Sequence, residues 1–399
     1  MIKIDTEPKS RLFRNIIKRN KGVHKLIQQT FMLEPTGARS TNFISNIKTK
    51  RFGKALVLCS MISALLATGA CSQQDSSSLT QALSIDTSEI TVSGLSSGGY
   101  MATQFHLSHA DIVKGAGIIA AGPYNCARGS IATVFAECLN QAPEAYAAEL
   151  MSPFSTNIAT PEQLSDSRVW ILHGTLDERI HANAANGLYK QYQSWLKPDS
   201  LVFVKDKPFA HLFPSDGLGG KCDVSESPFI GDCGFDAAGE MLQHILGPLN
   251  DKASVTDTDT LGTLYSLTQS DIADLSGASM AETAFAYLPN ACIEGKTCKL
   301  HISFHGCNQA VGNVDDAFAK STGLNQWAAT NQLIVLYPQI EKSAMMPMNP
   351  QACWDWWGYT DENYANKDGV QIQAVRSMVD ALAQSLSVII ANENLTQVN

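Results

Sequence analysis

The most regular feature of the chain is a series of short apolar runs between residues 90 and 337. Glycine, proline or polar residues bound these runs, a pattern that is typical of buried parallel strands. We expect strands at residues 90–93, 115–121, 169–173, 201–204, 300–304 and 333–337.

The segments between these runs carry apolar residues at helical spacing. Strands that alternate with helices predict an α/β fold, with a doubly wound, mostly parallel sheet flanked by helices. The polar stretch 251–259 is predicted to be a linker or a surface excursion, and no internal repeat is evident. We expect helices at residues 98–108, 182–195, 236–245, 317–330 and 370–391.

Charge divides the chain into two unlike parts. Of its 29 Lys/Arg and 38 Asp/Glu, residues 1–71 hold 13 and 3, a net charge of +10. Residues 72–399 hold the other 16 and 35, a net charge of −19. An acidic body argues against nucleic acid as a partner. Because 44% of the residues are hydrophobic, the chain can also bury a large core.

The basic N-terminal part resembles a targeting sequence. Basic residues at 48–54 precede an uncharged apolar segment at 55–70, the arrangement of a secretory signal peptide. Gly69 and Ala70 precede Cys71, as in the cleavage site of bacterial lipoproteins, so Cys71 is a candidate for lipidation and membrane attachment. Cleavage and release is the alternative. No apolar run reaches the roughly 18–20 residues of a membrane-spanning helix.

These features predict an exported protein, either an outer-membrane or cell-surface lipoprotein or a secreted or periplasmic protein. We divide the chain into an N-terminal extension at 1–47 of open status, a signal peptide at 48–71, a polar tether at 72–84 and a single α/β domain at 85–399.

Cysteine usage agrees with export. Of ten cysteines, eight lie outside the signal segment, and an even number suits disulfides in an oxidising compartment. Six fall into near neighbours and two remain, although eight cysteines allow 105 connectivities. No paired C-x₂-C spacing is present, so we expect no metal site. The pairs suggested by spacing are Cys126 with Cys138, Cys222 with Cys233, Cys292 with Cys298, and Cys307 with Cys353.

The clearest candidate for chemistry is a serine on a turn. Residues 94–98 read Gly-Leu-Ser-Ser-Gly and follow a predicted strand directly before a predicted helix. This G-x-S-x-G pattern in this context is typical of a nucleophile elbow, in which a sharp turn exposes the serine hydroxyl above the sheet. Ser96 is therefore the candidate nucleophile, and an idle serine in a glycine-rich turn is the alternative.

A serine needs a base, and in α/β-hydrolases the acid and then the histidine follow the serine in sequence. Asp177 follows the predicted strand 169–173, and His211 follows the strand 201–204, so we expect them to be the acid and the base. Glu178 and Asp166 compete for the acid, but Asp166 precedes its strand. The other histidines that could be structural are His106, His109, His173, His181 and His305.

The oxyanion hole needs two backbone N–H donors. The first is expected from Ser97, the residue after the nucleophile. The second usually comes from a His-Gly loop that precedes the serine, whereas here His305-Gly306-Cys307 follows the predicted base. A circular permutation explains this order. It predicts that the strands ending at His305 and Tyr337, with the helix 370–391, pack in space immediately before the Ser96 strand.

Taken with these motifs, the chain resembles the polyhydroxybutyrate (PHB) depolymerase family of esterases, in its circularly permuted single-domain branch of the α/β-hydrolase fold. The resemblance covers most of residues 85–390. The stretches that carry it are GLSSGGY at 94–100, GPYNCA at 122–127, HGTLD at 173–177, YLPNAC at 287–292, LHISFHGCNQ at 300–309, LYPQ at 336–339 and NPQACWDWWGYT at 349–360.

The resemblance implies a secreted enzyme that hydrolyses 3-hydroxyalkanoate esters. It implies a triad of Ser96, Asp177 and His211 and an oxyanion hole formed by the Ser97 and Cys307 amides. It also implies that Trp354 contacts substrate, and Tyr100 and His305 are further candidates for this role. Three tryptophans at 354–357 would suit a flat aromatic rim for an aliphatic polyester, although packing in the core is the alternative.

The motifs imply no cofactor, and we expect a monomer. The chain ends soon after its last predicted helix, so we expect binding to a solid granule to rely on the surface of the α/β domain. The leading hypothesis is a serine esterase that cleaves PHB or its oligomers. The alternatives are a general short-chain or feruloyl-type carboxylesterase of the same fold and, from another class, a non-catalytic surface lipoprotein that binds ligand.

Overall fold

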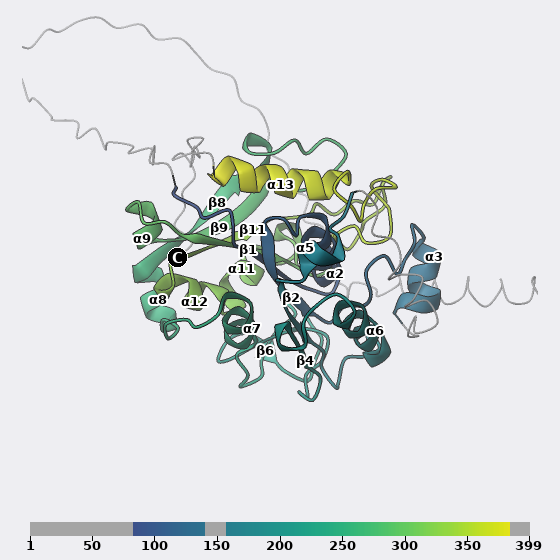
Figure 1. The fold of residues 1–399 in the computed structure, drawn as a ribbon, viewed down its shortest axis with the longest axis horizontal. Helices are drawn as coiled ribbons and strands as arrows, with labels where there is room; N and C mark the ends of the chain where they lie inside the picture. Colours follow the sequence, from purple (N-terminus) through teal and green to yellow (C-terminus); the bar gives the residue numbers. More distant parts are fainter. Residues whose placement is uncertain (1–82, 140–156, 384–399) are drawn as a thin grey trace, which may run out of the picture. The chain divides into compact units, whose positions relative to one another are not determined.

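The computed structural model describes residues 83–139 and 157–383 (Figure 1). The N-terminal extension, the signal peptide, the Cys71 lipidation candidate and almost all of the tether lie outside the described residues. The described residues all belong to one compact unit.

An eight-stranded sheet forms the centre of this unit, with the strand order β4-β3-β2-β1-β10-β11-β9-β8. The six strands from β4 to β11 are parallel and are the six predicted from the apolar runs. They are β1 (Ile90–Leu95), β2 (Val113–Ile119), β3 (Arg168–Leu172), β4 (Leu201–Val204), β10 (Lys299–Phe304) and β11 (Leu333–Tyr337).

Two further strands, β8 (Gly262–Thr268) and β9 (Thr283–Pro289), extend the sheet in antiparallel pairing. The apolar pattern did not predict them. β8 is only partly buried and has polar residues among its apolar ones, whereas the apolar run of β9 was overlooked. The sheet is therefore mostly parallel, as predicted, with an antiparallel edge.

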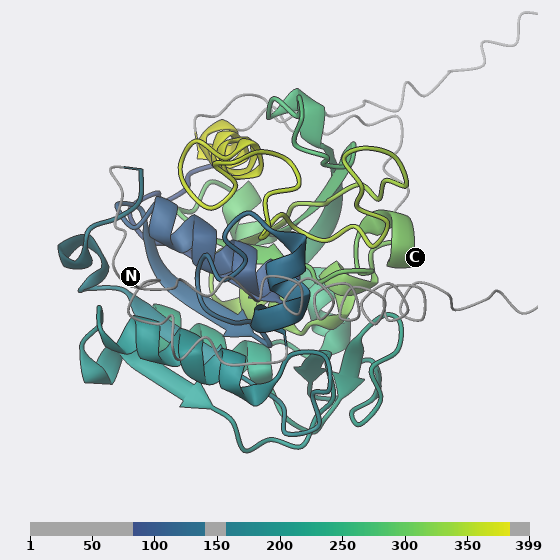
Figure 2. The same ribbon diagram turned by 90° about the vertical axis from the view of Figure 1, so that its right-hand side faces the viewer.

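Helices cover both faces of the sheet. The side chains of β11 alternate between two apolar clusters, because successive residues of a strand point to opposite faces. One cluster includes helices α2 (Ser97–Ser108), α6 (Ala182–Gln193) and α13 (Val370–Ala383), and the other includes α7 (Ala237–Leu246), α11 (Ala317–Ser321) and α12 (Leu324–Thr330). Figure 2 turns the ribbon by 90° and shows the helices around the sheet from the side.

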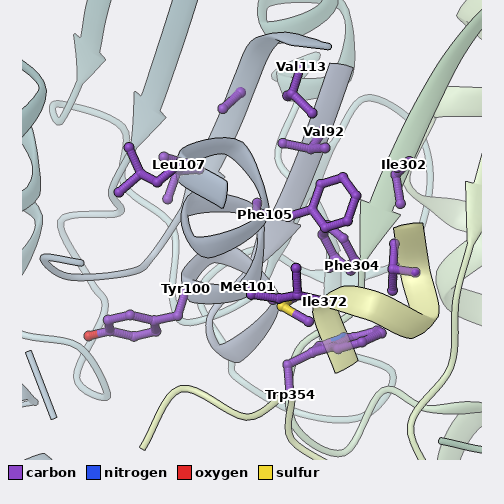
Figure 3. Packing of buried hydrophobic residues seen from close by; sticks show 14 of the residues in the cluster. Val92, Tyr100, Met101, Phe105, Leu107, Val113, Ile302, Phe304, Trp354 and Ile372 are labelled. Atoms are coloured by element: carbon purple, nitrogen blue, oxygen red, sulfur yellow. The ribbon is translucent and has the colours of Figure 1, made fainter. Parts of the chain in front are cut away.

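Figure 3 shows the first cluster, in which Met101 and Phe105 of α2 lie against β1 and β10, with Ile372 of α13 beside them. The predicted permutation is visible in the sheet order, because β10 pairs directly with β1 and β11 pairs with β10. The register places Gly94 opposite Phe304, so the two strands end next to each other.

Two helical expectations need correction, and a third is only partly covered by the described residues. The predicted helix at 317–330 is two helices, because Gly323 adopts a φ of 82° between α11 and α12. The stretch 251–259 is not merely a linker, since it contributes most of α8 (Val255–Leu261), which the Ser254 side chain caps by accepting from Asp257 N–H. Helix α13 is described to Ala383, and the rest of the predicted segment lies outside the described residues.

Short elements complete the unit. A three-stranded parallel sheet has the order β5-β7-β6, formed by β5 (Phe213–Ser215), β6 (Gly220–Lys221) and β7 (Ile230–Asp232). The short helices are α3 (Ile131–Thr133), α5 (Pro161–Leu164), α9 (Asn290–Ile293) and α10 (Val311–Val314), with η1 (Val134–Cys138), η3 (Pro198–Ser200) and η4 (Gln269–Asp271).

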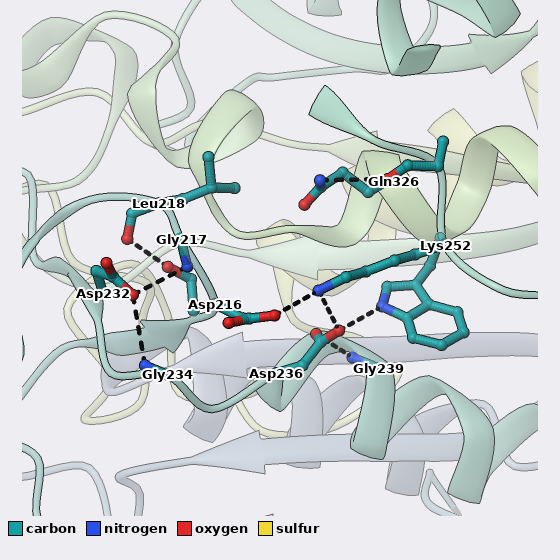
Figure 4. A network of polar contacts seen from close by, with 12 residues as sticks. Asp216, Gly217, Leu218, Asp232, Gly234, Asp236, Gly239, Lys252 and Gln326 are labelled. Carbon is teal, nitrogen blue, oxygen red and sulfur yellow. Dashed lines mark hydrogen bonds and ion pairs between the residues drawn. The ribbon is translucent and has the colours of Figure 1, made fainter. Parts of the chain in front are cut away.

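A polar network connects the segment of the small sheet to helices α7 and α12 (Figure 4). The Lys252 ammonium lies 2.9 Å from both the Asp216 and the Asp236 carboxylates. Asp236 also accepts from the Gly239 amide at the start of α7 and from the Trp327 indole of α12. Asp216, Asp236 and Lys252 follow the predicted base His211 in sequence, and these contacts connect their segment to α7 and α12.

The structure contains the four disulfides that the cysteine spacing suggested: Cys126–Cys138, Cys222–Cys233, Cys292–Cys298 and Cys307–Cys353. Disulfides persist in oxidising compartments, so this cross-linking fits an exported protein. Among the described residues, no helix is both long enough and apolar enough to cross a membrane.

Candidate active site

Ser96 lies on a strained turn between β1 and α2. Its φ of 56° and ψ of −120° are unfavourable for a residue with a side chain. The two flanking glycines are required by space: a Cβ on Gly94 would lie 2.1 Å from the Gly98 carbonyl oxygen, and one on Gly98 would lie 2.1 Å from the Phe304 carbonyl oxygen. The strand, the helix and β10 can therefore meet at Ser96 only because residues 94 and 98 are glycine.

The predicted acid and base are in direct contact. His211 Nδ1 lies 2.8 Å from Asp177 Oδ2, while Asp177 Oδ1 accepts from the amides of Arg179 and Ile180. Because the carboxylate can only accept, Nδ1 carries the proton and Nε2 has the lone pair. Burial alone would raise the pKa of Asp177, but the hydrogen bond and charge of His211, together with the Ile180 amide, hold that pKa below its ordinary value.

Sheet topology brings these residues to one edge. Ser96 follows β1, Asp177 follows β3 and His211 follows β4, and the carboxyl ends of these parallel strands share an edge. No hydrogen bond joins Ser96 Oγ to His211 in the described part of the chain. Such contacts are often loose without substrate and tighten in the reactive complex.

The competing candidates have other roles or positions. Asp166 is exposed and forms an ion pair with Lys197, on the side where β3 begins. Glu178 is exposed. His181 caps α6, where its Nδ1 accepts from the Asn183 amide. His106 lies buried between Tyr192 and Ser167, and His109 and His173 are also buried.

The two expected oxyanion donors come from the start of α2 and from the loop after β10. The Ser97 amide is in the first turn of α2, where N–H groups have no acceptor within the helix. The Cys307 amide donates to no other group among the described residues. Gly306 places this loop against the nucleophile, since a Cβ there would lie 3.5 Å from Ser96 Cβ. The Cys307–Cys353 disulfide fixes the loop from the opposite side.

The three residues expected to contact substrate are all buried, which agrees with the alternative of core packing for Trp354. Trp354 and His305 are 0% exposed and Tyr100 is 2% exposed. Trp354 packs against Phe304 and His305, and Tyr100 stacks on Trp356 with ring centroids 3.9 Å apart. The exposed aromatic rim is therefore absent at Trp354, and direct contact of these side chains with substrate stays a prediction.

Within residues 83–139 and 157–383, no three His, Cys, Asp or Glu side chains gather as a group that could hold a metal ion. The residues around Ser96 instead supply a hydroxyl, an imidazole, a carboxylate and two free amides. Such a set is suited to acyl transfer through a covalent intermediate.

Sequence comparison identifies close relatives. The model of the prolyl oligopeptidase family matches residues 76–212, which contain Ser96, Asp177 and His211. The chain is 38% identical over 310 residues to a poly(3-hydroxybutyrate) depolymerase of Delftia acidovorans, covering 76% of this chain and 61% of that protein. It is 34% identical over 316 residues to a polyhydroxybutyrate depolymerase of Talaromyces funiculosus, covering 75% of this chain and 90% of that protein.

Solved structures agree with this result. A PHB depolymerase complexed with an R3HB trimer superposes with a TM-score of 0.69 at 30% identity, over 76% of this chain and 98% of the other. The PHB depolymerase from Penicillium funiculosum gives a TM-score of 0.68 at 30% identity, over 78% and 98% of the two chains. The fold is therefore that of the α/β-hydrolases in this group.

The Cys307–Cys353 disulfide generates a prediction, because it restrains the Cys307 amide. We expect the double variant Cys307→Ser/Cys353→Ser to lose about 10- to 100-fold in kcat on p-nitrophenyl butyrate, below the roughly 10²–10³-fold cost of a complete donor. The matched control Cys292→Ser/Cys298→Ser removes the disulfide between α9 and β10 and should retain kcat. Equal kcat values for the two variants, at a temperature where both stay folded, would contradict the role of this disulfide.

Proposed function

Because the chain belongs to the poly(3-hydroxybutyrate) depolymerase family of carboxylic ester hydrolases, we propose that it is a serine esterase that hydrolyses poly(3-hydroxybutyrate) or its oligomers. The observation that carries this proposal is the 2.8 Å hydrogen bond between Asp177 and His211, at the sheet edge where β1 delivers Ser96. The complex of a relative with an R3HB trimer supports an oligoester as substrate.

In the proposed mechanism, Ser96 Oγ attacks the ester carbonyl carbon while His211 Nε2 takes the hydroxyl proton. The Ser97 and Cys307 amides stabilise the oxyanion that forms. His211 then gives the proton to the leaving alcohol oxygen, which leaves an acyl ester on Ser96. A water molecule, deprotonated by His211, hydrolyses that ester, and the proton returns to Ser96 Oγ. Asp177 holds the imidazole in the required tautomer and stabilises its charged form.

Exposed apolar residues near this edge support a solid polymer as substrate. Ile131 and Phe135 follow β2, Leu176 follows β3, and a methionine-rich loop at 345–348 follows β11. Since these strands run parallel to β1 in one sheet, the segments after them leave the sheet at the Ser96 edge. Apolar side chains exposed around a site are typical of a binding surface for an apolar partner.

The methionine-rich loop is the most exposed of these segments. Met346 is 87% exposed, and Met345 is 78% exposed. Ser343 and Asn349 close the loop by exchanging two backbone hydrogen bonds of 2.9 Å. The Asn349 side chain also bonds the backbone N–H and carbonyl of Cys353, so the loop is joined to the disulfide behind the oxyanion donor. We propose that it adsorbs to the surface of the polyester.

The first test compares two substrates, p-nitrophenyl butyrate and amorphous PHB granules. We expect wild type to cleave both and Ser96→Ala to lose at least about 10⁴-fold in kcat while it stays folded. Cleavage of the soluble ester alone would favour a general short-chain or feruloyl-type carboxylesterase. If folded wild type cleaves neither ester, or if Ser96→Ala retains turnover, the proposed function is wrong.

The second test removes the exposed methionines. We expect Met345→Ser/Met346→Ser/Met348→Ser to lower granule binding about tenfold, which corresponds to the loss of roughly 1.4 kcal/mol of apolar contact. Its kcat on p-nitrophenyl butyrate should be unchanged. Val255→Ser/Leu261→Ser in α8 replaces exposed apolar residues elsewhere and is the matched control. Equal granule binding by both variants would refute adsorption through this loop.

We also propose that the exported protein is a monomer that is attached to a membrane through a lipid on Cys71. Gly69 and Ala70 before Cys71 support this proposal. We expect mass spectrometry of the mature N-terminal peptide to find an acylated Cys71, and we expect Cys71→Ser to move the protein from the membrane fraction to the soluble one. An unmodified N-terminus at another residue would indicate simple cleavage and release.

A further inference from the structure

His305 directly precedes the Gly306-Cys307 peptide, and both of its ring nitrogens are bonded. It follows β10 directly and is 0% exposed. Nδ1 lies 2.8 Å from the Gly306 carbonyl oxygen, and the Ile340 amide donates to Nε2 at 3.2 Å. A carbonyl oxygen only accepts and a backbone amide only donates, so these partners select the neutral tautomer with the proton on Nδ1.

The bond to Gly306 has a geometric consequence for the next residue. The Gly306 carbonyl and the Cys307 N–H belong to one planar peptide unit, and the two X-Pro bonds that are cis lie elsewhere in the described chain. In a trans peptide the C=O and N–H point in opposite directions. When His305 holds the carbonyl on one side, the Cys307 N–H is therefore directed to the other.

The rest of the loop leaves this peptide few other orientations. Gln309 Oε1 accepts from the Gly306 amide at 2.7 Å, and its Nε2 donates to the carbonyl oxygens of Pro228 and Phe229. The Gly306 carbonyl accepts from the Gln309 amide at 3.2 Å as well, so both backbone polar groups of Gly306 are bonded and the His305 bond is the shorter of the two to its carbonyl. The Cys307 amide, next in the chain, donates to no group among the described residues.

We propose that His305 is a positioning residue for the oxyanion hole: its Nδ1–H holds the Gly306 carbonyl and thereby aims the Cys307 N–H at the substrate oxyanion. This inference rests on the proposed esterase function. It takes the place of the direct substrate contact expected for His305, because the ring is fully buried and both of its nitrogens are bonded to the backbone.

The surroundings of the ring favour the neutral form that this role needs. Phe318 and Trp354 flank His305, with ring centroids 6.2 and 5.6 Å away. Burial lowers the pKa of His305 to about 4, although the hydrogen bond to Gly306 opposes the shift. A charged ring would also turn an Nε2–H toward the Ile340 N–H, and two donors cannot bond each other.

Two substitutions of His305 test its two ring hydrogen bonds one at a time. In His305→Asn the amide nitrogen can take the place of Nδ1 and donate to the Gly306 carbonyl, and the bond from Ile340 is lost. In His305→Gln the longer side chain places its oxygen near Nε2, where it accepts from Ile340. The Gly306 carbonyl then keeps only the 3.2 Å hydrogen bond from the Gln309 amide. Both variants replace the ring by an uncharged amide and lose similar packing, so each is the control of the other.

We expect His305→Gln to lose about 10²-fold in kcat on p-nitrophenyl butyrate with little change in KM, because an oxyanion donor acts in the transition state. His305→Asn should stay within about tenfold of wild-type kcat, with a thermal midpoint similar to that of the Gln variant. Equal kcat values for the two variants, or a change confined to KM, would overturn the proposal. Inactive wild type would instead refute the esterase function itself.

A measurement on wild type tests the proposal even where a variant fails to fold. The ¹⁵N chemical shifts of the His305 ring in the labelled protein report which nitrogen carries the proton. We expect a protonated Nδ1 and an unprotonated Nε2 at neutral pH. A proton on Nε2 would mean that the ring cannot donate to Gly306, and the proposal would be wrong.

Discussion

The pairing of β1 with β10 is the contact on which the proposed site depends. It joins Gly94 to Phe304, about 210 residues apart, and lets the elbow glycine Gly98 lie against the carbonyls of residues 304 and 305. Through this contact Ser96 and the loop that carries Cys307 lie next to each other. The permuted order of the chain therefore does not alter the geometry, because the sheet restores in space the neighbours that the sequence separates.

Several buried groups hold the proposed catalytic groups in position. Asp177 holds His211, a disulfide holds Cys307, and His305 with Gln309 holds the intervening glycine. Preorganised donors stabilise a developing charge because they need little rearrangement when the reaction occurs. The exposed apolar loops emerge at the same edge, where a water-insoluble chain would have to approach Ser96.

The sequence predicted the parts that local sterics and burial determine. A Cβ at Gly94 or at Gly98 would lie 2.1 Å from a backbone oxygen, so both positions flanking Ser96 require glycine. The six predicted apolar runs form the six parallel strands. The antiparallel strand β8 was missed because its partial burial weakens the apolar pattern, whereas β9 has an apolar run that the prediction overlooked. The role of His305 could not be predicted, because its hydrogen-bond partner at Ile340 and its full burial arise only from tertiary packing.

The most direct test of the central claim is a crystal structure of the protein after reaction with a dialkyl phosphoryl inhibitor. The inhibitor's phosphoryl group mimics the tetrahedral intermediate on the nucleophile. The account predicts a covalent bond to Ser96 Oγ, with the phosphoryl oxygen about 2.7–3.1 Å from the Ser97 and Cys307 nitrogens. A bond to another residue, or a phosphoryl oxygen that points away from both amides, would contradict it.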